Sequence, residues 1–125
     1  MAYATEAMQG GLSAGTALAI GGQGASVAAA GSAITDATVV KASISIVTAA
    51  DGNKGVKLVG SIGDEVWLFN DSGSTLKVYG DASTVAISVA GTGLGSAGTA
   101  FSQLTYKATS YKKQSATQWF AITSA

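Results

Sequence analysis

Apolar and polar residues alternate with a period of two along much of the chain. Side chains of a β-strand point alternately to its two faces, so this period predicts strands. Within residues 38–48 (TVVKASISIVT), the pattern places four apolar side chains on one face, opposite a mostly polar face: Val40, Ala42, Ile44 and Ile46. Residues 83–91 (STVAISVAG) alternate in the same way. We therefore expect a protein built mainly from short strands.

Clusters of glycine, asparagine, aspartate and serine separate the apolar runs and indicate turns. The predicted strands are 38–48, 56–62, 66–69, 76–79, 83–91, 100–113 (with a bend near 108–110) and 117–123. The turns at Asp51-Gly52 and at 70–75 predict that the strands before them return as hairpins. The expected fold is all-β, a small antiparallel β-sandwich or barrel, and no helical period of any length competes with it.

The first part of the chain has a different amino-acid composition. Residues 1–33 are rich in glycine, alanine and serine, which predicts an extended N-terminal arm followed by a β domain over 34–125. The arm carries four larger apolar residues that we expect to contact a partner surface: Met8, Leu12, Leu18 and Ile20. Either the arm becomes ordered on a partner, or it is a loose terminus.

Two strands carry large apolar residues on both faces. In Val66–Phe69, Trp67 points away from Leu68, and near the C-terminus Trp119 points away from Phe120. One member of each pair can enter the core of a single domain, and the other needs separate cover. A second copy of the chain could supply that cover, and so could the arm folded back over the domain.

The chain is poor in charge. Charged residues make up 11% of it, against about 25% in typical soluble domains. All seven cations are lysines, and the net charge is zero. Weakly charged, near-neutral surfaces tend to associate, so this composition favours a surface in contact with other subunits. The alternative is a monomer kept soluble by its serine, threonine and glycine surface.

The sequence contains few of the residues that usually act in catalysis. The chain has no histidine and no cysteine, which excludes the usual triads and makes a zinc or iron site unexpected. Asp64 and Glu65 are adjacent, so in a strand they face opposite ways and cannot share a substrate. The loop GTGLGSAG (91–98) lacks the Gly-Lys-Ser/Thr of a phosphate-binding loop. Aspartates in turns lack the spacing of a calcium loop. We expect a non-enzyme without a cofactor.

Nucleic acid and membrane are not expected partners. Lysines mix with Tyr106 and Tyr111, but the net charge is zero and arginine is absent, whereas phosphate binding depends on positive charge. No run of about 18 apolar residues could span a membrane. No lysine or arginine precedes Lys41, so the positive region of a signal peptide is missing, and we expect synthesis and retention in the cytosol.

The stretches GDEVWLFNDSGSTLKVYG (63–80) and GTAFSQLTYKATSYKKQSATQWFAI (98–122) resemble a small module of tailed-bacteriophage structural proteins. The likeness extends over about residues 10–123. The matching positions are Gly63, Asp64, Val66, Leu68, Asn70, Gly73, Leu76, Val78, Tyr79, Ser115, Ala116, Thr117, Gln118 and Trp119. The chain departs from the module at Gly80, where a proline is usual.

The resemblance implies a non-enzymatic, β-rich homotrimer that decorates the outside of the virion capsid. As a cement protein it would be made in the bacterial cytoplasm and would stabilise the shell where subunits of the major capsid protein meet. The expected subunit interface contains five aromatic residues: Trp67, Phe69, Tyr79, Trp119 and Phe120. The alternative is a receptor- or carbohydrate-binding tip of a head fibre or tail fibre, with Trp119, Tyr106 and Tyr111 as exposed platforms.

Overall fold

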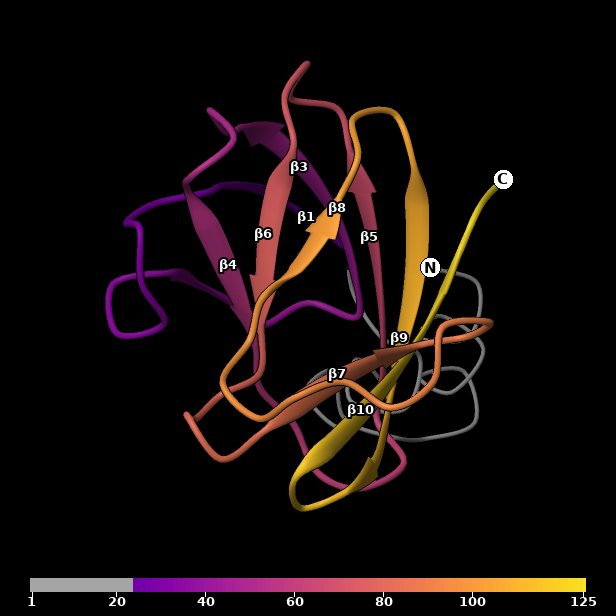
Figure 1. Ribbon diagram of the computed structural model, residues 1–125. Helices are drawn as coiled ribbons and strands as arrows, with labels where there is room; N and C mark the ends of the chain where they lie inside the picture. The colour runs from indigo at the N-terminus through magenta and orange to yellow at the C-terminus, as the bar shows by residue number, and fades with distance from the viewer. Residues whose placement is uncertain (1–23) are drawn as a thin grey trace, which may run out of the picture.

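The computed structural model describes residues 24–125 (Figure 1). Strands and turns make up this part of the chain, and no helix occurs in it, which confirms the all-β expectation. The strands are β1 (Gly24–Ala28), β2 (Thr38–Val40), β3 (Ile44–Ala49), β4 (Gly55–Leu58), β5 (Glu65–Asn70), β6 (Leu76–Tyr79), β7 (Ala86–Val89), β8 (Phe101–Gln103), β9 (Ala108–Ser115) and β10 (Gln118–Thr123).

These strands form two sheets. A six-stranded sheet has the order β1-β3-β5-β9-β10-β7, and a four-stranded sheet has the order β2-β4-β6-β8. The pairs β1–β3, β3–β5, β2–β4, β4–β6 and β7–β10 are parallel, and only the pairs made by β8 and β9 are antiparallel. The expectation of an antiparallel fold is therefore wrong, and both sheets are mixed.

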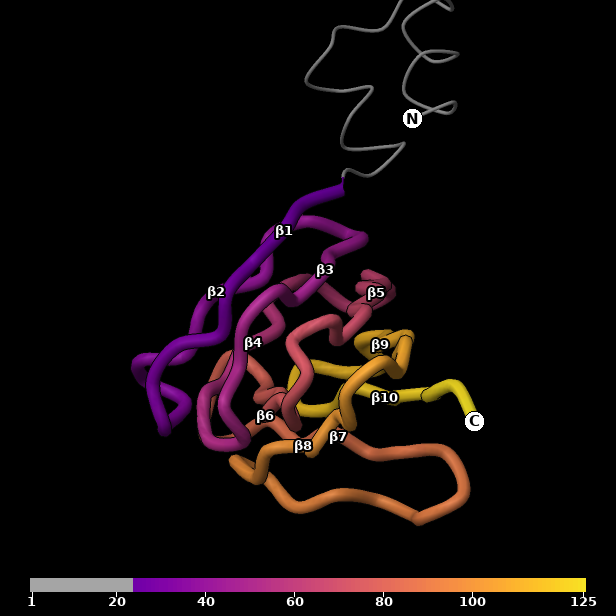
Figure 2. Tube along the Cα trace, turned by 90° about the horizontal axis from the view of Figure 1, so that it is seen from above, coloured from indigo at the N-terminus to yellow at the C-terminus, as the bar shows by residue number. Residues whose placement is uncertain are grey.

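The path of the chain explains the parallel pairs. From β1 to β6 the chain crosses to the other sheet after every strand, so each strand lies beside the one two places earlier (Figure 2). The predicted hairpins at Asp51-Gly52 and at 70–75 do not form, because β3 and β4, like β5 and β6, belong to different sheets. The expected bend in 100–113 is a full crossing, since β8 and β9 also lie in different sheets.

The predicted strand 38–48 is divided by this crossing. β2 ends at Val40, and the chain resumes as β3 at Ile44 in the six-stranded sheet. Val40 and Ala42 are buried as expected, but in β3 the buried residues are Ser45 and Val47. The turn over residues 41–43 therefore reverses the inward face, and Ile44 and Ile46 point to solvent instead of the core.

The core lies between the inward faces of the two sheets. The six-stranded sheet contributes Val47, Val66, Leu68, Tyr111 and Trp119, and the four-stranded sheet contributes Val40, Val56, Leu58, Leu76 and Val78. Most of these side chains are medium-sized, and Trp119 and Tyr111 are the largest fully buried ones in the described residues. Each buries roughly 150–250 Å², so these two dominate the apolar area of the core.

The boundary of the β domain lies earlier than expected. Residues 24–28 form β1, which pairs in parallel with β3, and Ala29 is buried in the core cluster. The ten residues 24–33 that we assigned to the arm are thus part of the domain. The arm residues expected to contact a partner, Met8, Leu12, Leu18 and Ile20, lie outside the described residues.

Candidate interaction surface

The outer face of the six-stranded sheet carries large apolar side chains. In β5 burial alternates residue by residue: Val66, Leu68 and Asn70 point inward, and Trp67 and Phe69 point outward. The expected opposition of Trp67 and Leu68 is confirmed, because Leu68 is fully buried while Trp67 is 45% exposed. β10 repeats the arrangement, with Trp119 fully buried and Phe120 42% exposed.

The strand register brings these outward residues into one surface. Ile44 of β3 lies opposite Trp67, and Ile46 lies opposite Phe69. Across β9, the small residue Ser110 lies between Trp67 and Ile122. We call this surface the apolar face. Its members, all between 38% and 66% exposed, are Ile44, Ile46, Trp67, Phe69, Phe120 and Ile122.

The charges on this sheet face are balanced. Glu65 and Lys112 are cross-strand partners at one end of the apolar face, and the Ser110 hydroxyl donates a hydrogen bond to Glu65 Oε1 at 3.0 Å. Lys112 is also the partner of Phe120 on β10. One carboxylate and one ammonium therefore flank the aromatic residues, and the face as a whole has no net charge to repel another copy of itself.

A shallow apolar hollow continues the apolar face at the β7 edge. It is lined by Ser88, Val89, Ala90, Gly91, Gly93, Leu94, Phe120, Ala121 and Ile122. Leu94, on the loop after β7, is 79% exposed. A contiguous apolar area of this kind on one side of a small domain usually marks an interaction site.

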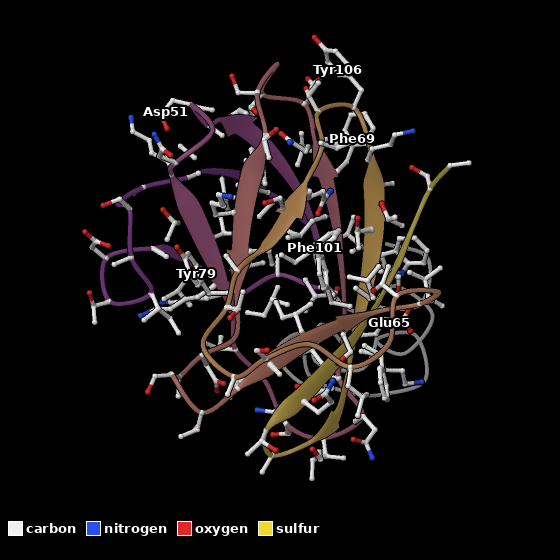
Figure 3. The ribbon with its side chains drawn as sticks, in the orientation of Figure 1. Asp51, Glu65, Phe69, Tyr79, Phe101 and Tyr106 are labelled. Atoms are coloured by element: carbon white, nitrogen blue, oxygen red, sulfur yellow. The ribbon has the colours of Figure 1, made fainter. Side chains whose placement is uncertain are left out.

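The structure separates the five residues expected at the subunit interface. Trp67, Phe69 and Phe120 meet on the apolar face. Trp119 is in the core of the single chain, so the expectation is corrected: its side chain has no surface left for another subunit. Tyr79 lies on the outer face of the four-stranded sheet, on the opposite side of the core from Phe69, so it is not part of the apolar face, and its place at an interface stays a prediction (Figure 3).

Sequence reasoning missed Ile44, Ile46 and Ile122. The two residues of β3 were assigned to the inward face because the pattern of 38–48 was followed as one strand. No local signal marks the change of sheet, because Lys41, Ala42 and Ser43 continue the alternation of apolar and polar residues.

The environment of Trp119 is partly polar. Lys113 points inward from β9, and its Nζ lies 5.7 Å from the centre of the indole ring. The same ammonium donates a hydrogen bond to Gly60 O at 2.8 Å and lies 3.6 Å from Asp81 Oδ2. The Trp119 indole N–H has no hydrogen-bond partner among the described residues. These contacts tie the turns after β4 and β6 to the core.

The alternative role as a binding tip depends on other aromatics. Of its three platforms, Trp119 and Tyr111 are buried, and Tyr106 is 63% exposed. Tyr106 also has a positive φ of 60°, and its backbone N–H donates to Asn70 O at 2.6 Å. Of the three aromatic residues expected to be exposed at a binding tip, only Tyr106 is exposed. The receptor-binding alternative stays a prediction.

The acidic residues singled out in the sequence have local structural partners. Asp51 Oδ1 accepts hydrogen bonds from the backbone N–H groups of Asn53 and Lys54, both at 3.0 Å, and these bonds lower the pKa of Asp51. Asp64 Oδ2 accepts the backbone N–H of Ser61 at 2.8 Å.

Within residues 24–125, no group of three or more histidine, cysteine, aspartate or glutamate side chains could hold a metal ion. That part of the chain also contains no helix suited to crossing a membrane.

Comparison with known proteins returned no matching family model, no matching curated protein and no matching solved structure.

Proposed function

We propose that this protein is a structural component of a tailed-phage virion that decorates the outside of the capsid as a homotrimer. In this proposal three two-layer β-sandwich subunits join through their apolar faces, and the trimer sits where major capsid subunits meet. The added contacts between capsid subunits would strengthen the shell, and the protein would reach it after synthesis in the bacterial cytoplasm.

The observation that carries the proposal is the exposure of Trp67, Phe69 and Phe120 on one sheet face. Burying these rings in an interface would stabilise the complex by about 25 cal/mol for each Å² of apolar surface removed from water. Apolar and aromatic residues without uncompensated charge also characterise the centre of protein interfaces. The poor charge of the whole chain and its likeness to phage structural modules point to the same class of protein.

The test begins with the oligomeric state. Wild-type protein should have the mass of three chains by light scattering at micromolar concentration, and Trp67→Ser should weaken association by about 2 kcal/mol or more, as expected for an aromatic residue at an interface centre. Ile62→Ser is the matched control, because Ile62 is 66% exposed on the turn between β4 and β5 and lies outside the apolar face.

Acrylamide quenching gives a second readout of the same contact. Trp119 is fully buried in the single chain and should be protected at every concentration, whereas Trp67 should become protected only as the protein associates. Finally, the wild type should sediment with phage heads that lack it. A monomer at all concentrations would contradict the trimer, and a trimer that never binds heads would contradict decoration alone.

A further inference from the structure

The outer face of the four-stranded sheet has a different chemistry from the apolar face. On this sheet Lys57 lies opposite Tyr79, and Lys77 lies between Gly55 and Ser102. Because their neighbours in sequence are core residues, Lys57, Lys77 and Tyr79 all point away from the core. We call these three residues the lysine face.

Among the described residues 24–125, no carboxylate forms an ion pair with the lysines of this face. No carboxylate occurs in the four strands of this sheet. In the described residues the one ion pair within 4.0 Å joins Lys113 to Asp81. The Lys77 ammonium donates instead to the Ser102 hydroxyl at 2.9 Å. The neighbouring loop before β2 carries the carboxylate of Asp36, which accepts the backbone N–H of Ala33 at 3.0 Å and forms no ion pair with these lysines within 4.0 Å.

Tyr79 holds a fixed position between these lysines. Its ring covers the backbone of Gly55, because a Cβ added to Gly55 would come within 2.7 Å of Tyr79 Cε2. Its hydroxyl lies 3.5 Å from Ser32 O, which the tyrosine can reach as a donor. The pairing of β4 with β6 and the contact of Tyr79 with Gly55 make this surface rigid. A rigid surface loses little conformational entropy on binding.

We propose that the lysine face binds an acidic protein surface, and this inference rests on the proposed function, in which that surface belongs to the capsid. If the apolar faces meet around the trimer axis, the four-stranded sheets point outward. One lysine face is then turned toward each of the capsid subunits that surround the trimer. Opposite charges on the two surfaces would speed the encounter and fix the orientation of the trimer.

Nucleic acid is a poorer match for this face than an acidic protein. Affinity for phosphate groups grows with the number of lysines and arginines that neutralise them. Here the face carries two lysines, arginine is absent, and the chain has no net charge. An acidic protein surface presents a few localised carboxylates, which two ammonium groups can pair with.

The experiment compares charge-reversed variants in the head-binding assay. Lys57→Glu with Lys77→Glu should weaken sedimentation with heads about tenfold or more and leave the trimer mass unchanged. The double Lys→Gln variant should show an intermediate loss, because it removes attraction without adding repulsion. Lys107→Glu is the control, since Lys107 lies in the turn between β8 and β9 and outside the lysine face.

The outcomes separate the two proposals. If wild-type protein binds heads and the double Glu variant binds equally well, the inference is overturned and the proposed function stands. If the wild type forms trimers but does not bind heads, both fail. If double-stranded DNA shifts on a gel with the wild type and not with the double Glu variant, the face recognises nucleic acid, which also overturns the inference.

Discussion

A buried set of polar residues holds the turns at one end of the sheets. Asn70 Nδ2 donates hydrogen bonds to Ser74 O at 2.8 Å and to Gln103 O at 3.0 Å. Gln103 Nε2 donates to Leu68 O and to Lys107 O, and its Oε1 accepts the Tyr111 hydroxyl at 2.7 Å. The side chains of Asn70, Gln103 and Tyr111 are all fully buried, so these bonds satisfy polar groups inside the core.

This arrangement was only partly predictable from the sequence. Asn70 stands before a run of turn residues, which indicates a turn, but nothing local shows that its amide reaches a strand 33 residues later. Gln103 and Tyr111 were both placed on one predicted strand, 100–113, whereas the chain changes sheets between them and both side chains are buried. Alternation within 66–69 did show that Trp67 and Leu68 would face opposite ways, and burial confirmed it.

At this scale we predict that Tyr111→Phe destabilises the protein. Without the hydroxyl, Gln103 Oε1 is left buried without that donor, which costs about 1–3 kcal/mol. Urea unfolding should show a lower midpoint with an unchanged slope. Tyr106→Phe is the control, because Tyr106 is 63% exposed and its change should move the midpoint little. An equal loss in both variants would contradict the role of the buried hydroxyl.

Burial raises the pKa of Tyr111, and this adds a pH dependence to the same prediction. The unfolded chain releases the tyrosine proton near pH 10, while the folded chain keeps it. Above pH 10 the unfolded state therefore binds fewer protons, and the free energy of unfolding falls as pH rises. Below pH 10 this contribution is fully present. Between pH 9 and about 11, the free energy of unfolding should therefore fall by less for Tyr111→Phe than for the wild type.

Individual strands were easier to predict than their partners. Each predicted strand overlaps an observed one, because an alternating pattern is a local property of the chain. The partner of a strand is not local: a crossing after each strand pairs β3 with β5 and β4 with β6, and turn residues alone do not distinguish a crossing from a hairpin. β1 was missed because Gly24–Ala28 is made of small residues whose alternation carries little hydrophobic contrast.

Gly80 marks one of these crossings, from β6 in the four-stranded sheet to β7 in the six-stranded sheet. It is buried, and an added Cβ would lie 2.3 Å from Val85 Cγ1, so the turn from β6 to β7 has no room for a side chain. We predict that Gly80→Ala displaces Val85 from the core and costs about 1–3 kcal/mol in urea unfolding.

The matched change for Gly80 is Gly24→Ala. At Gly24 a Cβ would meet only Ile44 O, at 3.8 Å, which is an ordinary contact. This variant should unfold within about 0.5 kcal/mol of the wild type, as most surface substitutions do. If Gly80→Ala were as stable as Gly24→Ala, the tight packing of that turn would be refuted.

The whole molecule has two unlike outer surfaces on one thin core. The sequence showed that some aromatic residue would lack cover within a single domain, but it could not show which side that residue would share with others. Only the register of the six-stranded sheet brings Ile44 and Ile46 beside Trp67 and Phe69. Likewise, Lys57 is about 20 residues away from Lys77 and Tyr79 in the chain, and the pairing of β4 with β6 brings it beside them.

Because the two surfaces differ in chemistry, salt should act on them differently. Raising NaCl from about 0.1 M to about 1 M shortens the Debye length from about 10 Å to about 3 Å. Contact through the lysine face depends on charge, so head binding should weaken steeply over this range. Contact through the apolar face depends on removing surface from water, which salt does not weaken, so the trimer should persist.

Light scattering and head sedimentation along one salt series would measure both effects on the same samples. The wild type should remain trimeric while it dissociates from heads, and the double Lys→Gln variant should show a flatter salt dependence than the wild type. Dissociation of the trimer into single chains at high salt would mean that charge holds the subunits together. Glu65 and Lys112, rather than the aromatic residues beside them, would then make the main contact.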